Sequence, residues 1–321
     1  MPKVSIVVPA CNTSKTIGET LKSLQQQTFT DFEVIIVDDG STDTTQLAVA
    51  PFLKDPRFFL VVQPNRGLAG ARNTGVLHSQ GEYIGLCDSD DLWHPRKLTA
   101  HVAHLDMAGD VGLSYSGSEF IDDNSRRMRG RQSPRLHGVD AAHVFKRNPV
   151  GNGSAAVVRR AAFDAIAYTP RPGDKRLWFF DETFRQSEDI ECWLRLALTT
   201  DWGVEGVSGH LTKYRVSSAG LSANTDRQLL SWERMVAKLR PVNPEFFERH
   251  EQAARAYQLR YLTRRAISAR DRLQAGELAQ RFMQTSRTPL TEEPIKTCVT
   301  LAAAALLSRT RWDPMQLVTR S

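Results

Sequence analysis

The sequence predicts an α/β fold in which a mostly parallel, doubly wound sheet occupies residues 1–225 and a helical region follows over residues 226–321. Two patterns support this prediction. Runs rich in β-branched residues alternate with amphipathic stretches of helical length through the first 120 residues, as expected for successive βαβ units. After Asp226 the apolar residues recur with a helical period only. We therefore expect one α/β domain and one helical C-terminal region.

The strands and helices of the α/β domain are expected to alternate. Expected strands cover 4–8, 33–37, 58–62 and 83–87, and expected helices cover 16–26, 44–53 and 68–78. A helix at 95–108, strands at 111–115 and 155–159, and a helix at 188–198 follow. The polar, Arg-rich residues 122–134 are predicted to form a mobile surface loop, either merely solvated or near a substrate. In the C-terminal region, helices are expected at 228–239, 244–268, 273–284 and 291–308.

Composition is that of an ordinary soluble globular protein, with 41% hydrophobic and 24% charged residues among 321. The 4 cysteines show no CxxC spacing, which argues against a zinc site and favours a reducing compartment. The apolar run at 4–8 is too short for a signal peptide, and the run at 299–307 is too short to cross a bilayer, which takes about 20 residues. We expect a cytoplasmic protein, or one peripheral at the inner face of the cell membrane.

Positive charge is concentrated in the helical region. Residues 226–321 contain 17 Lys and Arg against 10 Asp and Glu, whereas the first 225 residues are nearly neutral. This predicts either an anionic surface or partner for the C-terminal helices, or simply a basic solvated surface. The apolar residues 301–307, flanked by Lys296, Arg309 and Arg311, suit an anionic membrane surface or packing on the α/β domain. No recognition motif accompanies these charges, so nucleic acid is not an expected partner.

Three carboxylates, Asp88, Asp90 and Asp91, directly follow the apolar strand at 83–87. Carboxylates this close raise one another's pKa unless a cation lies among them. Oxygen-rich clusters suit Mg²⁺ or Mn²⁺, and the alternative is an acidic turn or helix cap. The position after a parallel strand favours the metal, with Asp90 as its ligand and Asp88 bound to metal or ribose. We expect Asp91 to cap the next helix.

Two further motifs follow the ends of predicted strands, where open α/β sheets bind ligands. Pro9, Ala10 and Asn12 come after the first strand, and Asp38, Asp39 and Gly40 come after the second. A carboxylate at this place can accept hydrogen bonds from a ribose hydroxyl or a base N–H. The alternative is a capped turn, which explains the glycine but does not need two aspartates.

Two motifs indicate what the site binds and how it reacts. The Gly-rich residues 63–75 enter a helix with Arg66 and Arg72 nearby, an arrangement that can bind pyrophosphate. They lack the spacing of a dinucleotide fingerprint or a P-loop, which disfavours hydride and ATP chemistry. Glu188 and Asp189 begin an amphipathic helix, where they either stabilise the helix dipole or supply a general base, Asp189.

Five segments, taken in order over residues 3–220, resemble those of the family 2 glycosyltransferases: 4–12, 37–43, 65–75, 81–91 and 187–189. Each is modestly specific, and their order is strongly specific. Processive members of that family carry a QxxRW motif; residues 308–312 lack its Gln, so a single sugar addition is expected.

The resemblance implies a GT-A fold, which is Rossmann-like, and an inverting reaction that depends on Mn²⁺ or Mg²⁺. It implies the following roles: Asp39 recognises the nucleotide base, Asp88 and Asp90 form the DxD motif, Asp189 deprotonates the acceptor, and Pro9, Ala10, Asn12 and Arg72 lie at the nucleotide pocket. We thus expect transfer from a nucleotide sugar, UDP-linked, to a glycan or lipid-linked glycan in cell-surface polysaccharide synthesis. The alternatives are a nucleotidyltransferase and a non-catalytic module that binds a sugar nucleotide.

Overall fold

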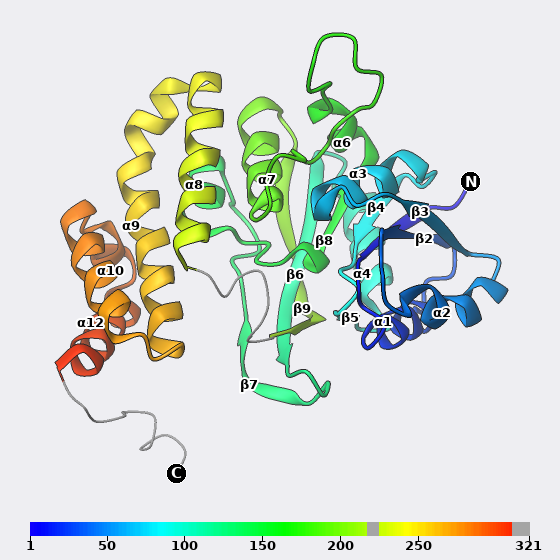
Figure 1. Ribbon diagram of the computed structural model, residues 1–321. Helices are drawn as coiled ribbons and strands as arrows, with labels where there is room; N and C mark the ends of the chain where they lie inside the picture. The colour runs from blue at the N-terminus through cyan, green and yellow to red at the C-terminus, as the bar shows by residue number, and fades with distance from the viewer. Residues whose placement is uncertain (217–224, 310–321) are drawn as a thin grey trace. The chain divides into compact units, whose positions relative to one another are not determined.

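The computed structural model describes residues 1–216 and 225–309 (Figure 1). These residues fall into two compact units. The first holds residues 1–144 and 148–216, and the second holds residues 145–147 and 225–309.

The first part of the sheet is parallel, as predicted. Its strands are β1 (Val4–Ala10), β2 (Phe32–Asp39), β3 (Phe58–Gln63) and β4 (Tyr83–Leu86), in the order β3-β2-β1-β4. The connections contain α1 (Ile17–Gln25), α2 (Thr45–Val49), the 3₁₀ helix η1 (Ala50–Lys54) and α3 (Gly67–His78). The carboxyl ends of these strands therefore meet at one edge of the sheet, where the predicted motifs lie.

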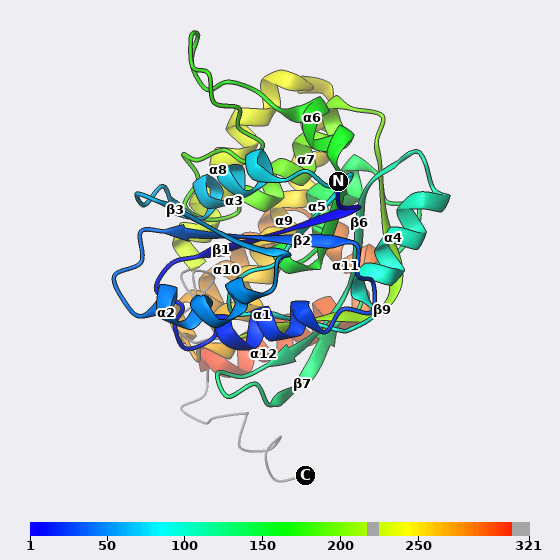
Figure 2. The same cartoon turned by 90° about the vertical axis from the view of Figure 1, so that its right-hand side faces the viewer.

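Helices lie on both faces of this part of the sheet (Figure 2). Val34 and Ile36 join a core with α1, α2 and α4 (Lys97–Met107). Ile35 and Val37 pack on the opposite face against Ala71 of α3. Because consecutive strand residues face opposite sides, the continuous apolar runs of β1 and β2 are what a sheet covered on both faces requires.

The second part of the sheet is mixed. β8 (Ala156–Arg159) pairs antiparallel with β4 and with β6 (Val111–Ile121), and β9 (Gly203–Arg215) runs parallel to β6. The short β5 (Leu92–Trp93) pairs antiparallel with β9. The helices of this part are α5 (Ala141–Arg147), α6 (Arg160–Ile166) and α7 (Glu188–Thr199), with a 3₁₀ turn η2 (Gly153–Ala155) before β8. This arrangement is an α/β fold with one continuous sheet.

Two strands of this part differ from what the sequence predicted. The Arg-rich residues expected to form a loop contain a strand, β7 (Arg127–Gln132), which pairs antiparallel with β6. Its side chains are mostly exposed, so no burial pattern marks it in the sequence. The 13-residue strand β9 was not predicted at all.

The second unit is helical, as predicted. It contains α8 (Thr225–Leu239), α9 (Pro244–Ser268), α10 (Arg272–Thr285), α11 (Thr288–Glu292) and α12 (Pro294–Arg309). Its core includes Leu259, Leu262, Phe282 and Leu307. Arg311 and Trp312, which were part of the sequence expectations, lie outside the described residues. In the part of the chain that is described, no helix combines the length and apolarity needed to span a membrane.

Candidate active site

The turn after β4 is fixed by two residues that are distant in sequence. Ser154 Oγ accepts a hydrogen bond from Asp88 N (2.8 Å) and donates one to Asp91 Oδ2 (2.6 Å). Arg215 donates from its backbone N to Asp91 Oδ1 (2.8 Å) and from Nε to the carbonyl oxygen of Asp90 (2.8 Å). Ser154 and Arg215 therefore set the conformation of the acidic turn.

Asp91 does not cap a helix, contrary to the prediction. Its side chain is fully buried and accepts the hydrogen bonds of Ser154 and Arg215, while Arg96 occupies the N-cap position of α4. Burial raises the pKa of Asp91 well above its usual range, as do Asp90 and Asp88. The buried carboxylate of Asp91 thus stabilises the conformation of the acidic turn.

Arg72 of α3 joins the acidic turn to the start of α7. Its Nη2 lies 2.7 Å from Asp88 Oδ1, and its Nη1 lies 2.5 Å from Glu188 Oε1. The Arg72 side chain is only 2% exposed, and it lies over the ring of Phe180 at 5.7 Å. The structure therefore brings Asp88 together with the Glu188–Asp189 pair, about one hundred residues away in sequence.

Asn73, the next residue of α3, fastens the segment that precedes α7. Its Nδ2 donates to the carbonyl oxygen of Phe180 (2.7 Å), and its Oδ1 accepts from the backbone N of Phe179 (3.0 Å) and of Phe180 (2.8 Å). All polar groups of this buried side chain are thereby used on one segment. Neighbouring residues of the Gly-rich motif thus position the carboxylates of α7.

The two carboxylates at the start of α7 both have a raised pKa. Burial raises the pKa of Glu188 to about 7, although Arg72 acts in the opposite direction. Burial also raises the pKa of Asp189, again against the effect of Arg72. Asp189 Oδ1 accepts a hydrogen bond from the backbone N of Ile190 (2.9 Å), and a raised pKa makes a carboxylate a stronger base. Glu191 and Arg195, four residues apart on α7, form an ion pair with Oε1 and Nε 2.9 Å apart.

Asp90 has the properties of a carboxylate that binds a cation. Burial raises its pKa to about 6, with Asp88 as a second cause. No Lys, Arg or His forms an ion pair with Asp90 within residues 1–216 and 225–309. Asp90 lines a hollow of about 340 Å³, together with Asn12, Thr13, Ser14, Lys15, Thr16, Asp43, Asp123 and Arg215. The charge of Arg215 acts against this rise in pKa, but Arg215 forms no ion pair with Asp90. A carboxylate beside an open space fits Mg²⁺ or Mn²⁺, which typically take one or two protein carboxylates and complete their shell with phosphate and water.

A metal ion at Asp90 would need ligands besides protein side chains. In the described ranges, no three or more His, Cys, Asp or Glu side chains form a group that alone would hold a metal ion. Asp88, the second predicted ligand, already shares one oxygen with Arg72.

The loops after β1 and β2 are tied to each other. Asn12, in the left-handed conformation at φ 54°, accepts hydrogen bonds at Oδ1 from the backbone N of Thr42 (2.8 Å) and of Asp43 (3.2 Å). Asp39 accepts at Oδ1 from Arg66 N and at Oδ2 from Gly67 N, both at 2.8 Å. Pro9 and Ala10 end β1 and are buried. The predicted nucleotide residues Pro9, Ala10, Asn12 and Asp39 therefore lie at the same sheet edge, and Asp39 links β2 to the start of α3.

Sequence reasoning missed the residues that organise the site through tertiary contacts. Ser154 lies in an unremarkable Gly-Ser-Ala segment, and Arg215 ends the strand that was not predicted. Glu188 was considered only as a dipole partner, and its pairing with Arg72 was not foreseen. In the sequence, only the adjacent polar residues Arg72 and Asn73 within the Gly-rich segment could have indicated that this helix contacts the carboxylates of α7.

Comparisons with known proteins identify the family of this chain. The sequence profile described as "Glycosyl transferase family 2" matches residues 5–167. The Escherichia coli protein WfgD, "UDP-Glc:alpha-D-GlcNAc-diphosphoundecaprenol beta-1,3-glucosyltransferase", is 26% identical over 226 residues, which cover 70% of this chain and 82% of WfgD. Escherichia coli chondroitin synthase is 45% identical over 123 residues, but these cover 38% of this chain and only 18% of the synthase.

The fold also has solved counterparts. The structure of Staphylococcus aureus TarS residues 1–349 with UDP superposes with a TM-score of 0.60 at 17% identity, covering 95% of this chain and 90% of that one. The Pyrobaculum calidifontis mannosyltransferase PcManGT gives a TM-score of 0.54 at 21% identity, covering 98% and 88%. These likenesses establish the GT-A fold with a helical C-terminal region. Together with the profile match over half of the chain, they show that this protein is a glycosyltransferase and belongs to glycosyl transferase family 2.

Proposed function

We propose that the protein is an inverting, metal-dependent glycosyltransferase that moves a sugar from a UDP-sugar to a lipid-linked glycan in cell-surface polysaccharide synthesis. One observation carries this proposal: Arg72 pairs with both Asp88 and Glu188, so the metal-type turn and the predicted base Asp189 share one site. The names of WfgD and of the 29% identical Escherichia coli WfaP, both UDP-Glc transferases to a diphosphoundecaprenol-linked acceptor, support the donor and acceptor classes.

In this mechanism Asp189 accepts the proton of the acceptor hydroxyl. The acceptor oxygen forms a bond to the anomeric carbon as the bond from that carbon to the diphosphate oxygen breaks, which inverts the configuration and releases the nucleoside diphosphate. A divalent cation bound by Asp90 and Asp88 would neutralise charge on the diphosphate. The raised pKa of Asp189 increases its basicity, and Arg72 holds Asp88 in place rather than contacting solvent.

The donor's nucleotide is assigned to the edge formed by β1 and β2. Pro9, Ala10 and Asn12 would line its pocket, and Asp39 would accept from the base N–H with the lone pairs that its internal hydrogen bonds leave free. Arg72 contributes to this pocket through Asp88, because its own terminal nitrogens are already paired.

We assign residues 1–225 to the transferase domain and residues 226–321 to membrane contact at the cytoplasmic face. Ile295, Val299 and Leu306 of α12 are 79%, 64% and 54% exposed, whereas Leu307 is buried in the helical core. This exposed stripe, with Lys296 beside it, replaces residues 301–307 as the expected membrane contact. Sedimentation with phosphatidylglycerol vesicles should fall when Ile295, Val299 and Leu306 are replaced by Ser, and unchanged sedimentation would refute this assignment.

The proposed chemistry is tested with Asp189→Asn. Transfer from UDP-glucose and related UDP-sugars to a lipid-diphosphate acceptor should fall by about 10³-fold or more, while the Kd for UDP measured by calorimetry stays within about twofold. The control Asp174→Asn removes an exposed carboxylate of the same unit and should leave both quantities unchanged. Full activity of Asp189→Asn would exclude Asp189 as the base. UDP binding without transfer in the wild type would favour a non-catalytic module, and nucleotide transfer would favour a nucleotidyltransferase.

A further inference from the structure

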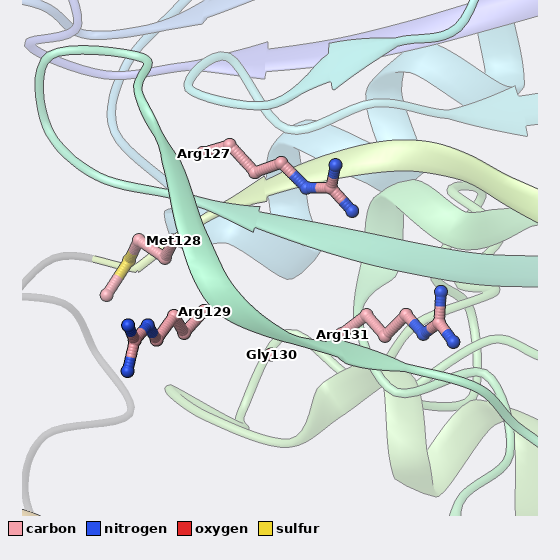
Figure 3. A pocket seen from close by; sticks show the side chains of 5 residues that line it. All are labelled: Arg127, Met128, Arg129, Gly130 and Arg131. Carbon is pink, nitrogen blue, oxygen red and sulfur yellow. The ribbon is translucent and has the colours of Figure 1, made fainter. Parts of the chain in front are cut away.

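Strand β7 and the residue before it carry a concentration of arginines that the transfer chemistry does not use. Arg126, Arg127, Arg129 and Arg131 fall within six consecutive residues, and all four are exposed. A hollow of about 480 Å³ is lined by Arg127, Met128, Arg129, Gly130 and Arg131 (Figure 3). We call these five residues the β7 hollow.

The charge of the β7 hollow is largely uncompensated. Arg127 lies 3.4 Å from Glu119 on the paired strand, and both side chains are open to solvent. Arg129 and Arg131 form no ion pair with any residue in the described ranges. Free guanidinium groups bind phosphate oxygens with two parallel hydrogen bonds, which favours phosphate over a general anion. Charged side chains also protect edge strands, but that role does not require arginine or a hollow.

The side chains of the β7 hollow combine cations with an apolar surface. Arg127 and Arg131 extend to one side of the strand, and Arg129 extends to the other side beside Met128 (Figure 3). Met128 is 39% exposed. A cation adjacent to an exposed thioether matches a ligand whose phosphate is joined directly to a hydrocarbon chain.

The turn that leads into β7 is connected to the active site. Arg215, which holds the acidic turn through Asp90 and Asp91, also donates from Nη1 to the carbonyl oxygen of Asp122 (2.8 Å) and from Nη2 to Ser125 Oγ (3.0 Å). The backbone N of Arg126 in turn donates to Asp122 Oδ1 (2.8 Å). One arginine therefore contacts both the acidic turn and the turn that leads into β7, so the β7 hollow is connected to the active site through Arg215.

We infer that the β7 hollow binds the diphosphate that links the acceptor glycan to its lipid. This inference rests on the proposed function, because it assigns the acceptor of that same site. Arg129 binds the diphosphate oxygens beside Met128, which contacts the first carbons of the lipid chain, while Arg127 and Arg131 add positive charge from the other side of the strand. The hollow selects acceptors by their linking group and leaves donor binding to the other sheet edge.

Calorimetric titration with farnesyl diphosphate tests the inference without knowledge of the acceptor sugar. UDP is present throughout so that it occupies the nucleotide site. In the variant Arg127→Gln/Arg129→Gln/Arg131→Gln the Kd for farnesyl diphosphate should rise at least about tenfold, while the Kd for UDP stays unchanged. Replacement of the same three residues by Lys keeps the charge without the paired geometry and should give a smaller rise.

A matched control separates the site from general loss of charge. Lys54→Gln/Arg171→Gln/Lys175→Gln removes three exposed cations of the same unit and should bind farnesyl diphosphate like the wild type. Equal weakening in this control would overturn the inference, as would unchanged affinity in the β7 variant. Loss of binding to phosphatidylglycerol vesicles with unchanged farnesyl diphosphate affinity would also overturn it, because the arginines would then contact the membrane.

The two proposals fail in different ways. Absence of UDP binding or of sugar transfer would refute the proposed function, while a β7-dependent affinity for farnesyl diphosphate would still be measured. Intact UDP binding and transfer with no effect of the β7 arginines would refute only the acceptor site.

Discussion

Arg72 and Asp88 form an ion pair at the centre of the active site, with Nη2 and Oδ1 2.7 Å apart and only 2% of the arginine side chain exposed. The same guanidinium holds Glu188 at 2.5 Å, so one buried cation compensates two carboxylates that come from different ends of the unit. A buried charge that loses its partner is strongly destabilising, because it cannot be solvated in place. The position of α7 relative to the acidic turn therefore depends on Arg72.

Arg72→Met should lower the free energy of unfolding by about 3 kcal/mol or more, because it leaves Asp88 and Glu188 close together without a cation. Urea denaturation monitored by circular dichroism measures this change. In the double variant Arg72→Met/Glu188→Gln, the free energy of unfolding should be only slightly lower than in Arg72→Met. The second substitution removes one of the two carboxylates that the loss of Arg72 leaves without a cation. Strictly additive losses would show that Arg72 and Glu188 do not interact.

Asp90→Asn should weaken metal activation specifically. Its carboxylate lines the hollow and has a pKa raised to about 6, so an amide removes a negative charge offered to the ion. The Mn²⁺ concentration for half-maximal transfer should rise at least about tenfold, and full activity of the wild type in EDTA would contradict a metal role. Asp123→Asn, which changes an exposed carboxylate of the same hollow, serves as the control and should shift it much less.

The extent to which the sequence predicted this fold follows from the source of each element's stability. The strands β1 and β2 are buried on both faces, so their apolar runs appear directly in the sequence. Strand β9 was missed because Gly203, Gly206 and Gly209 interrupt any alternation, and its conformation is imposed by pairing with β6 and β5. Strand β7 is stabilised by its pairing with β6 rather than by burial.

The residues of the candidate site likewise differ in whether a local sequence pattern or a tertiary contact determines their role. The positions of Asp39, Asp88 and Asp90 at strand ends and of Asp189 at the start of a helix were predictable, because each belongs to a local motif. The contacts of Ser154 with the acidic turn were not, since a single serine carries no local pattern. The fully buried Asp91 resembled a helix cap in sequence, and only its tertiary partners show its role.

Lys97 should make stability depend on pH. Its ammonium group is completely buried, with hydrogen bonds to the carbonyl oxygen of Ala155 (3.0 Å) and to Thr212 Oγ1 (3.2 Å). Burial lowers its pKa to about 7, while Cys87 and Asp91 raise it slightly. Above about pH 7 the native state loses this proton and the unfolded state keeps it up to about pH 10.4, so the unfolded state binds more protons. This group therefore makes the free energy of unfolding increase with pH, by up to about 1.4 kcal/mol per pH unit.

The measurement is the free energy of unfolding between about pH 7 and pH 9 in the wild type and in Lys97→Met. The variant should lose most of the upward slope, whatever its stability at one pH. Lys54→Gln, which changes an exposed lysine, should keep the slope. An identical slope in Lys97→Met would show that Lys97 has an ordinary pKa in the folded protein.

Gly153→Ala should disturb catalysis through Arg72 without unfolding the protein. A Cβ at this position would overlap Arg72 Nη2 and would lie 3.3 Å from Asp88 Oδ2. The end of an arginine side chain normally moves aside at little cost, but here Asp88 and Glu188 hold both terminal nitrogens. The methyl group should therefore displace Arg72 from Asp88 and lower kcat by about tenfold or more, for a loss of at least about 1.4 kcal/mol in transition-state stabilisation. Gly109→Ala, where a Cβ meets nothing within 4 Å, is the matched control and should leave kcat unchanged. Equal kcat in both variants would show that the Arg72–Asp88 pair tolerates displacement, and the ordering role of Arg72 would then have to be abandoned.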